Sequence, residues 1–268
     1  MSTTPNILDK IIAQKRLEVG ERKELYPVRL LEKSLYFEST PVSMRKYIQR
    51  PDLSGIIAEF KRKSPSKGII NAHAPVERTT IGYMQAGASA LSVLTDKPFF
   101  GGSNEDLTLA RRFNFCPIIR KDFTIDEYQV LEAKSIGADA ILLIAAVLTP
   151  AESKTLATLA HSLGMEVLLE VHDEAELQAN LEVGADMIGV NNRNLKTFEV
   201  SIEISKRLAP LIPASVVKVS ESGISSPETI RILREVGYEG FLMGENFMKH
   251  SRPEKAALEF IEQLTARV

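Results

Sequence analysis

Four similar blocks, each opening on a glycine, recur through the chain and constrain its fold more than any other feature. They begin at Gly87, Gly137, Gly184 and Gly237, which lie 50, 47 and 53 residues apart. Each glycine ends a helical pattern, where the left-handed backbone conformation favours glycine. A short apolar run bounded by turn residues follows, as expected of a buried strand. The recurrence therefore predicts a repeated unit of helix and strand.

Four further apolar runs lie between these blocks and complete the pattern. They follow Gly55, Pro117, Met165 and Ser215, so that strand and helix alternate eight times. Alternation implies parallel strands, and continuously apolar strands imply burial on both faces. The units therefore predict an α/β fold, a (β/α)8 TIM barrel. An open, doubly wound sheet is the alternative. It is disfavoured because no G-x-G-x-x-G motif follows the first strand.

Three of the intervening helices can be placed from the sequence. One helix is expected over 126–136. Another is expected over 173–183, where Asp173 as N-cap and Glu176 three residues later predict a capping box. A third is expected to begin at Ser226, with Pro227 in the first helical position.

Residues 1–50 stand outside the repeat and form an N-terminal helical extension to the barrel of residues 51–268, in a single domain overall. An amphipathic helix is expected to open at Thr4-Pro5, and a second, short helix is expected over 42–48. The apolar side of the first helix carries Ile7, Leu8, Ile11, Ile12 and Val19. Such an extension either plugs the floor of the barrel or dimerises, or it covers the active-site face.

Composition excludes several classes of protein. The chain of 268 residues has 33 Lys+Arg against 35 Asp+Glu, a net charge of −2, which argues against binding to duplex nucleic acid. Its single cysteine, Cys116, cannot form an internal disulfide. No apolar run is long enough for a membrane span, and the polar N-terminus lacks a signal core. We therefore expect a cytoplasmic protein with no nucleic-acid or membrane partner.

Charged residues stand where a barrel enzyme places its chemistry, at the carboxyl ends of strands. In the first strand Glu59, Lys61 and Lys63 share a face, Lys121 ends the third strand and Glu170 ends the fifth. Burial raises the pKa of a glutamate and neighbouring cations lower that of a lysine, which suits acid–base catalysis near neutral pH. Ion pairs with a purely structural role are the alternative.

The loops after the last two strands predict a phosphate site. Gly223 and Gly244 would let backbone N–H groups approach an anion, and Lys63 and Arg193 could supply the countercharge. The alternative is that both glycines only make tight turns. The four histidines have no metal-binding spacing, so neither a metal nor an organic cofactor is expected.

Seven strings over nearly the whole chain resemble the indole-3-glycerol phosphate synthase family of tryptophan biosynthesis. They are IIAEFKRKSPSKG (56–68), FFGGS (99–103), IIRKDF (118–123), LLEVHDEAEL (168–177), IGVNNRNL (188–195), SESGI (220–224) and MGENFM (243–248). The resemblance implies a lyase acting on 1-(2-carboxyphenylamino)-1-deoxyribulose 5-phosphate, a small anionic phosphosugar. Its pyrrole ring closes, and CO₂ and water leave, by general acid–base catalysis. It also implies an extension that covers the barrel mouth, and a monomer or homodimer.

The resemblance also implies residue roles. Lys121 matches the acid that protonates the carbonyl oxygen during ring closure. Glu59, Lys61 and Glu170 match the groups that share the dehydration. Asn191 and Ser222 match orienting residues, the phosphate would sit on Lys63, Arg193, Gly223 and Gly244, and an aryl pocket would be lined by Pro65, Phe100, Phe123 and Leu195. The chain departs from the family at Asn194, often Asp, and at Glu245, a small polar residue in some members.

Two other functions compete with this interpretation. An isomerase of phosphoribosylanthranilate would pair a cysteine with an aspartate, but Cys116 lies at the start of a strand, the wrong end of the barrel. A non-catalytic phosphosugar-binding barrel would have lost its charged strand ends, but Glu59, Lys61, Lys121 and Glu170 are all present.

Overall fold

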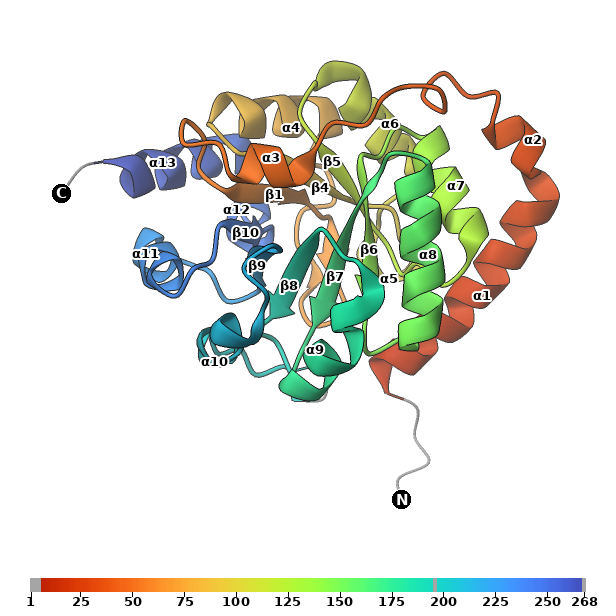
Figure 1. Ribbon diagram of the computed structural model, residues 1–268. Coiled ribbons are helices and arrows are strands. Elements are labelled where there is room, and N and C mark those ends of the chain that lie inside the picture. The colour runs from red at the N-terminus through yellow and green to blue at the C-terminus, as the bar shows by residue number, and fades with distance from the viewer. Residues whose placement is uncertain (1–5, 195–196, 267–268) are drawn as a thin grey trace.

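Eight parallel strands close on themselves to form a barrel (Figure 1). The computed structural model describes residues 6–194 and 197–266. In chain order the strands are β1 (Ile56–Phe60), β4 (Ala90–Leu94), β5 (Ile118–Lys121), β6 (Ala140–Ile144), β7 (Glu166–Val171), β8 (Met187–Asn191), β9 (Val217–Glu221) and β10 (Gly240–Met243). Pairing of β1 with both β4 and β10 closes the barrel, which confirms the predicted fold and all eight predicted strands.

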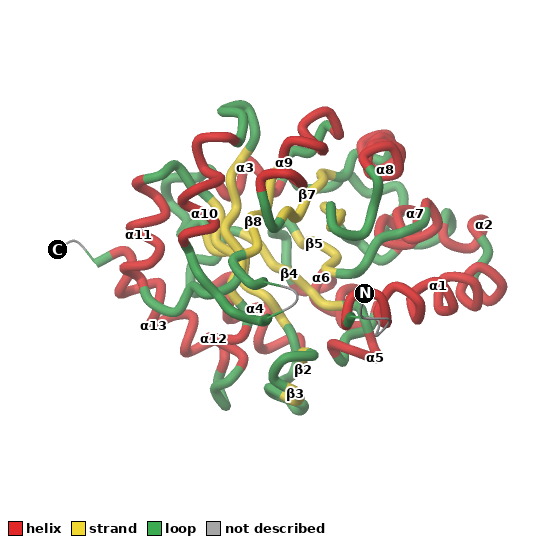
Figure 2. Tube along the Cα trace, turned by 90° about the horizontal axis from the view of Figure 1, so that it is seen from below, coloured by secondary structure: helices red, strands yellow, loops and turns green. Residues whose placement is uncertain are grey.

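Helices surround the barrel (Figure 2). The outer helices are α4 (Val76–Gln85), α6 (Asn104–Phe113), α7 (Glu127–Ser135), α8 (Pro150–Ser162), α9 (Glu174–Asn180), α10 (Glu203–Leu208), α11 (Pro227–Glu235) and α13 (Pro253–Thr265). Shorter pieces are α5 (Lys97–Phe100), α12 (Glu245–Met248) and the 3-10 turns Leu181–Val183 and Ala209–Leu211. Within the described residues, no helix combines the length and apolarity needed to cross a membrane.

A small hairpin leaves the barrel directly after β1. Its strands are β2 (Lys63–Ser64) and β3 (Gly68–Ile69), which pair antiparallel and form a sheet of their own, to one side of the barrel in Figure 2. The chain therefore turns out of the barrel wall after Phe60. The side-chain alternation of β1 does not continue to Lys63.

The predicted capping is only partly confirmed. Helix α11 opens at Ser226 with Pro227 in the first helical position, as expected, and α7 is capped by Asp126, for which no capping role was predicted. Asp173 caps α9 by accepting the Glu176 N–H at 2.9 Å, but the return half of the predicted box is wrong. The Glu176 carboxylate instead accepts the backbone N–H of His172 at 2.7 Å, and it also lies 3.1 Å from the His172 ring. The carboxylate therefore contacts His172, the residue before the N-cap, and not the backbone N–H of Asp173.

The extension places one helix on the barrel side and another at the barrel floor. Helix α1 (Ile7–Leu25) is capped by Asn6, two residues beyond the expected start at Thr4-Pro5, which lies outside the described residues. Helix α2 (Val28–Leu31) was not predicted, and α3 (Met44–Ile48) begins two residues after the predicted start. Residues Ile7, Leu8 and Ile11 line the cavity at the carboxyl ends of the strands.

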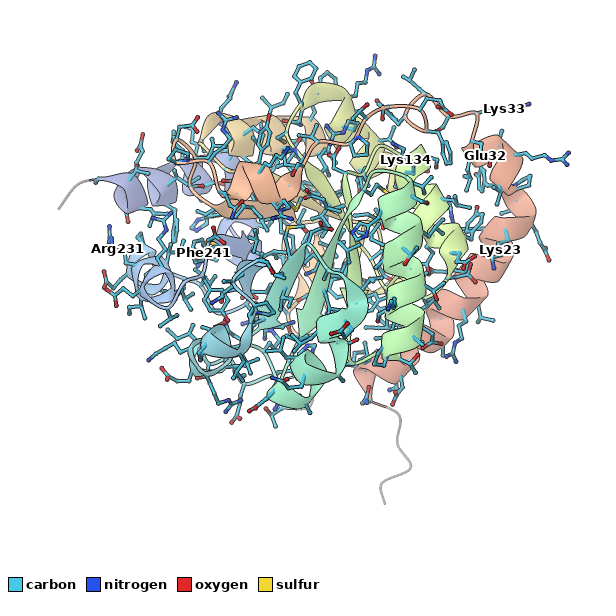
Figure 3. All side chains as sticks on the ribbon, in the orientation of Figure 1. Lys23, Glu32, Lys33, Lys134, Arg231 and Phe241 are labelled. Carbon is cyan, nitrogen blue, oxygen red and sulfur yellow. The ribbon has the colours of Figure 1, made fainter. Side chains whose placement is uncertain are left out.

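Helix α3 lies at the opposite end of the barrel (Figure 1). There Met44 and Ile48 belong to the apolar cluster of Ile57, Ala90 and Val217, close to where their strands begin. The last turns of α1 are held to the barrel side. Lys23, labelled in Figure 3, pairs with Asp126 ahead of α7 at 2.8 Å.

A buried lysine also holds α1 against the barrel. Lys15 is 3% exposed, and its Nζ lies 3.0 Å from Asp96 Oδ2 and 2.9 Å from Asp122 Oδ1. Asp96 follows β4 and Asp122 follows β5. Burial alone would lower the pKa of Lys15, but the two aspartates raise it, so the lysine stays charged. The extension is thus fastened by an ion cluster beside the carboxyl ends of two strands.

Candidate active site

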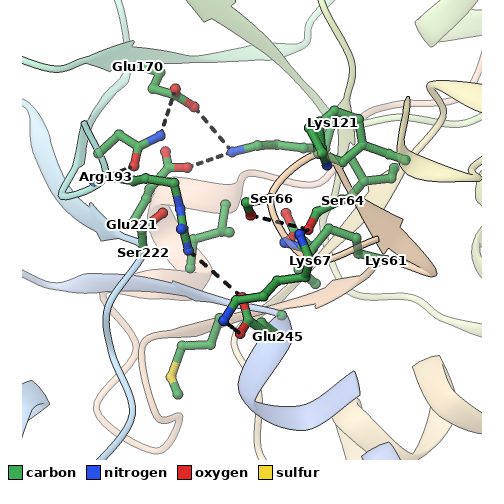
Figure 4. Close-up of a pocket in the computed structure, with 18 of the residues that line it drawn as sticks. Lys61, Ser64, Ser66, Lys67, Lys121, Glu170, Arg193, Glu221, Ser222 and Glu245 are labelled. Atoms are coloured by element: carbon green, nitrogen blue, oxygen red, sulfur yellow. Dashed lines mark hydrogen bonds and ion pairs between the residues drawn. The ribbon is translucent and has the colours of Figure 1, made fainter. Parts of the chain in front are cut away.

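A cavity of about 680 Å³ opens at the carboxyl ends of the barrel strands (Figure 4). The structure brings most of the sequence-predicted site residues to its wall. These are Glu59, Lys61, Pro65, Phe100, Lys121, Phe123, Glu170, Asn191, Arg193, Ser222, Gly223 and Gly244. They come from seven of the eight barrel strands, or from the loops that follow those strands. Convergence of acidic, basic and apolar residues on one concave surface makes this the candidate active site.

Of the predicted residues that the structure describes, one is not on that wall. Lys63 does not line the cavity; it lies in the β2–β3 hairpin, where its side-chain stem runs beside Gly101. The expectation that Lys63 shares the face of Glu59 and Lys61 is wrong because β1 ends at Phe60. Leu195 lies outside the described residues.

Lys121 is the central cation of the cavity. Its Nζ lies 2.5 Å from Glu221 Oε2 and 3.4 Å from Glu170 Oε2. Glu170 is held further by Asn191, whose Nδ2 donates to its Oε1 at 3.0 Å, and by the His172 ring at 3.3 Å. The end of β5 is thereby connected to the ends of β7, β8 and β9.

A second acid–base pair stands at the end of β1. The Lys61 ammonium lies 2.7 Å from Glu59 Oε1, and the Ser92 hydroxyl donates to Glu59 Oε2 at 3.4 Å. Glu59 is buried, whereas the Lys61 side chain is 17% exposed. The lysine can therefore meet a ligand while the carboxylate beneath it holds its ammonium in place.

The pKa values of Lys121 and Glu170 are shifted in directions opposite to those expected. Burial would lower the pKa of Lys121, but Glu221, Glu170 and Glu59 raise it above its ordinary value. Burial would likewise raise the pKa of Glu170, but Lys121 and then His172 lower it. The expectation of a depressed lysine and an elevated glutamate is wrong because each group is buried beside charges of the opposite sign.

Glu221 is the functional residue that the sequence reasoning missed. Burial raises its pKa to about 7, with Glu170 and Glu59 acting in the same direction against Lys121. Its Oε1 is buried without a hydrogen-bond partner among the described residues. Glu170, by contrast, is held by Asn191 and His172, so Glu221 is the carboxyl that takes up a proton. A signal was present, because an acid at the end of a buried strand had already singled out Glu170.

Glu221→Gln is expected to remove a pH dependence of stability. The pKa of Glu221 rises on folding from 4.5 to about 7, so between these values the folded state holds a proton that the unfolded state has lost. Its contribution to stability is therefore full below pH 4.5 and is lost as the pH rises through about 7. Urea unfolding over this range should show the wild type losing stability relative to the variant, by at most about 1.4 kcal/mol per pH unit. Parallel profiles would contradict the assignment.

The loop after β9 carries two consecutive residues in the left-handed backbone region. Ser222 has φ 65° and Gly223 has φ 76°. Left-handed backbone is costly for serine, and it persists where the surroundings hold it. Here the buried Asn192 donates to the Ser222 carbonyl at 3.1 Å. Gly223 therefore makes a tight turn, and this conformation is compatible with an N–H that meets an anion.

Packing also explains why residue 244 is a glycine. A Cβ at Gly244 would come within 2.6 Å of the Glu59 carboxylate. The glycine therefore lets a catalytic-site carboxylate pass close to the backbone, whatever else the loop binds.

An apolar wall faces the ions. The rings of Phe100 and Phe123 lie 5.9 Å apart between centroids and are tilted by 38°. Leu142 and Ile144 of β6 extend this wall, and neither was predicted because both look like ordinary barrel core in the sequence. Cys116 lies apart, buried at the start of β5, where burial raises the pKa of its thiol to about 12. In the described part of the chain no group of His, Cys, Asp or Glu side chains has the arrangement of a metal site.

Comparison with known proteins identifies close relatives. Residues 8–260 match the family model "Indole-3-glycerol phosphate synthase". An indole-3-glycerol phosphate synthase of Bacteroides thetaiotaomicron is 49% identical over 259 residues, which is 97% of this chain and 99% of that protein. One from Polaromonas naphthalenivorans is 45% identical over 257 residues, 95% of this chain and 98% of that protein.

Solved structures match in fold alone. The 3-hexulose-6-phosphate synthase of Salmonella typhimurium has a TM-score of 0.61 at 13% identity, covering 78% of this chain and 97% of that chain. The N-acetylmannosamine-6-phosphate 2-epimerase of Clostridium perfringens has a TM-score of 0.60 at 16% identity, covering 82% and 96%.

Proposed function

The chain belongs to the indole-3-glycerol phosphate synthase family, and from that premise we propose which of its residues carry out the reaction. The enzyme is a carboxy-lyase of tryptophan biosynthesis that binds a phosphorylated substrate. It converts 1-(2-carboxyphenylamino)-1-deoxyribulose 5-phosphate into indole-3-glycerol phosphate, CO₂ and water. The observation that carries the assignment is a charged Lys121, 12% exposed at its side chain, held between two carboxylates at the end of the barrel.

Lys121 is the acid for ring closure. A ring carbon of the anilino group attacks the C2′ carbonyl, and the developing negative charge on oxygen needs a proton donor. The raised pKa of Lys121 keeps it protonated in the free enzyme. Glu221, with a pKa of about 7 and 2.5 Å away, is the neighbour that can return a proton to it. Lys121 and Glu221 thus work as one proton-transfer unit.

The dehydration requires an acid for the leaving hydroxyl and a base for the proton. Lys61 suits the acid because it is partly exposed to the cavity and is oriented by Glu59. Glu170 suits the base because Lys121 and His172 lower its pKa and keep it ionised. Asn191 and Ser222 are orienting residues: Asn191 holds Glu170, and Ser222 is fixed in its left-handed backbone by Asn192.

The two ends of the substrate bind to different strands. Phosphate binding is assigned to Arg193, Gly223 and Gly244, which follow β8, β9 and β10. The aryl group is assigned to Pro65, Phe100 and Phe123, which follow β1, β4 and β5. Binding at both ends holds the reacting atoms between Lys61 and Lys121, and orientation of this kind can be worth several kcal/mol, roughly 7 or more in favourable systems.

Arg193→Ala is expected to raise KM roughly 10- to 100-fold with little change in kcat, since a charge-assisted hydrogen bond contributes about 1.5–3 kcal/mol. Steady-state kinetics followed by indole fluorescence measure both constants. Arg207→Ala is the matched control, because Arg207 is exposed on α10 and does not line the cavity. A fall in kcat at unchanged KM would refute a phosphate-binding role for Arg193.

The chain is further proposed to act as one domain and as a cytoplasmic monomer or homodimer. Within the extension of residues 1–50, the start of α1 is proposed to cover the mouth of the barrel of residues 51–268, whereas α3 packs at the barrel floor. Support for the cover comes from Ile7, Leu8 and Ile11 on the cavity wall and from the Lys15 ion cluster. Sedimentation equilibrium distinguishes the two oligomeric states.

A further inference from the structure

An acidic side chain lies among the cations of the proposed phosphate end. Glu245 is the first residue of α12 and comes directly after Gly244. Its side chain is 38% exposed and lines the same cavity as Arg193. A negative charge is unfavourable beside a bound phosphate, so its place here needs an explanation.

The Glu245 carboxylate bridges two cations from separate loops. Its Oε1 lies 3.5 Å from Lys67 Nζ in the β2–β3 hairpin. Its Oε2 lies 3.8 Å from Arg193 Nη2 in the segment after β8. Figure 4 shows the carboxylate reaching both side chains, one oxygen toward each. A phosphate group offers the same chemistry, an anion with several oxygens that pairs with arginine and lysine.

The bridge is loose. Charge-assisted N–H···O contacts are ordinarily about 2.7–2.9 Å, shorter than either distance here. Lys67 is 54% exposed at its side chain, so solvent screens its pairing. Among the described residues the Glu245 carboxylate has these two ion pairs and no closer hydrogen bond. A carboxylate held in this way is readily displaced by an anion of higher charge.

We propose that Glu245 competes with the substrate's phosphate for Arg193 and Lys67 and thereby sets the affinity of the enzyme for that group. In the free protein the carboxylate pairs with both cations and keeps them oriented toward the cavity. Phosphate binding transfers Arg193 and Lys67 to the phosphate oxygens and turns the carboxylate toward solvent. Lys67 is then a second phosphate-binding cation. This inference rests on the proposed phosphate end of the site.

Glu245→Gln removes the charge and keeps the size of the side chain, so it isolates the competition. Inorganic phosphate is the probe, with its Kd measured by isothermal titration calorimetry. The variant is expected to bind phosphate roughly 3- to 10-fold more tightly at low salt, because the like charge beside the anion is gone. The gain in phosphate affinity should shrink at high salt. The variant's KM for the full substrate should fall by a similar factor, and its kcat should stay unchanged.

Matched variants complete the test. Glu228→Gln removes an exposed glutamate that pairs with Arg231 on α11, away from the cavity, and should leave the phosphate Kd unchanged. Lys67→Met should weaken phosphate binding several-fold. Unchanged or weaker binding by Glu245→Gln would overturn the competition, and weaker binding would indicate that the carboxylate only anchors Arg193.

Arg193→Ala separates this inference from the assignment beneath it. If Arg193→Ala weakens phosphate binding and Glu245→Gln does not strengthen it, the competition is wrong and the phosphate end stands. If Arg193→Ala leaves the phosphate Kd unchanged, the assignment of the phosphate site is wrong, and the proposed competition by Glu245 is wrong as well.

Discussion

Lys121→Ala is expected to lower kcat by at least about 100-fold, the usual contribution of a general acid. The variant removes the proton donor for ring closure and leaves Glu170 and Glu221 facing each other without the cation between them. The two carboxyl groups then share a proton rather than ionise together. Steady-state indole fluorescence with the purified variant measures the loss.

A control and a folding measurement accompany this result. Lys154→Ala removes an exposed lysine of α8 and should retain wild-type kcat. Circular dichroism establishes that the Lys121 variant is folded before its kcat is compared. Near-normal turnover by a folded Lys121→Ala protein would show that Lys121 is structural.

Lys15→Met is expected to destabilise the protein by about 3–5 kcal/mol, the usual loss when one partner of a buried ion pair is removed. Methionine keeps much of the side-chain volume but leaves the buried Asp96 without this cation and the buried Asp122 with Arg120 alone, at 3.3 Å; the aspartates are 0% and 3% exposed. Urea unfolding followed by circular dichroism measures the change in the free energy of unfolding.

The pH dependence of the free energy of unfolding in acid gives a second test of the role of Lys15. Burial would raise the pKa of Asp122, but Lys15 and Arg120 lower it from 3.8 to about 2. Its contribution to stability is therefore present above pH 3.8 and lost as the pH falls through about 2. Lys15→Met should weaken this dependence. Lys10→Met, an exposed change in the same helix, is the control. A loss below about 1 kcal/mol would show that the cluster does not fasten the extension.

The barrel was predictable because its information is local. Each buried strand is a short apolar run, and most helices begin at a recognisable cap. The order of strands and helices can therefore be recognised from short stretches of sequence. Eight alternating units then leave few ways to bury every strand. The capping box at Glu176 failed because a neighbouring side chain, the His172 ring, competes for the carboxylate.

The site was predictable only as far as strand alternation reaches. Glu59, Lys121 and Glu170 stand at strand ends and were found, but extending the alternation to Lys63 crossed the point where the chain leaves the barrel. Lys15 went unnoticed although it is four residues from both Ile11 and Val19, on the buried side of α1, because its aspartate partners are far away in the sequence.

The directions of the pKa shifts could not come from the sequence either. They depend on which charges meet in three dimensions, and here Lys121 meets three carboxylates. The family resemblance supplied residue roles that alternation alone leaves open. Glu245, for which the resemblance supplied no role, is where the structure of this chain adds most.

The proposed function requires that this cavity closes the indole ring with the protein's own acids and bases. The most direct measurement gives the purified wild-type protein 1-(2-carboxyphenylamino)-1-deoxyribulose 5-phosphate and follows indole fluorescence over time. We expect a rise in fluorescence, with and without added metal, that Lys121→Ala reduces by at least about 100-fold. Absence of product from the wild-type protein under both conditions would contradict it.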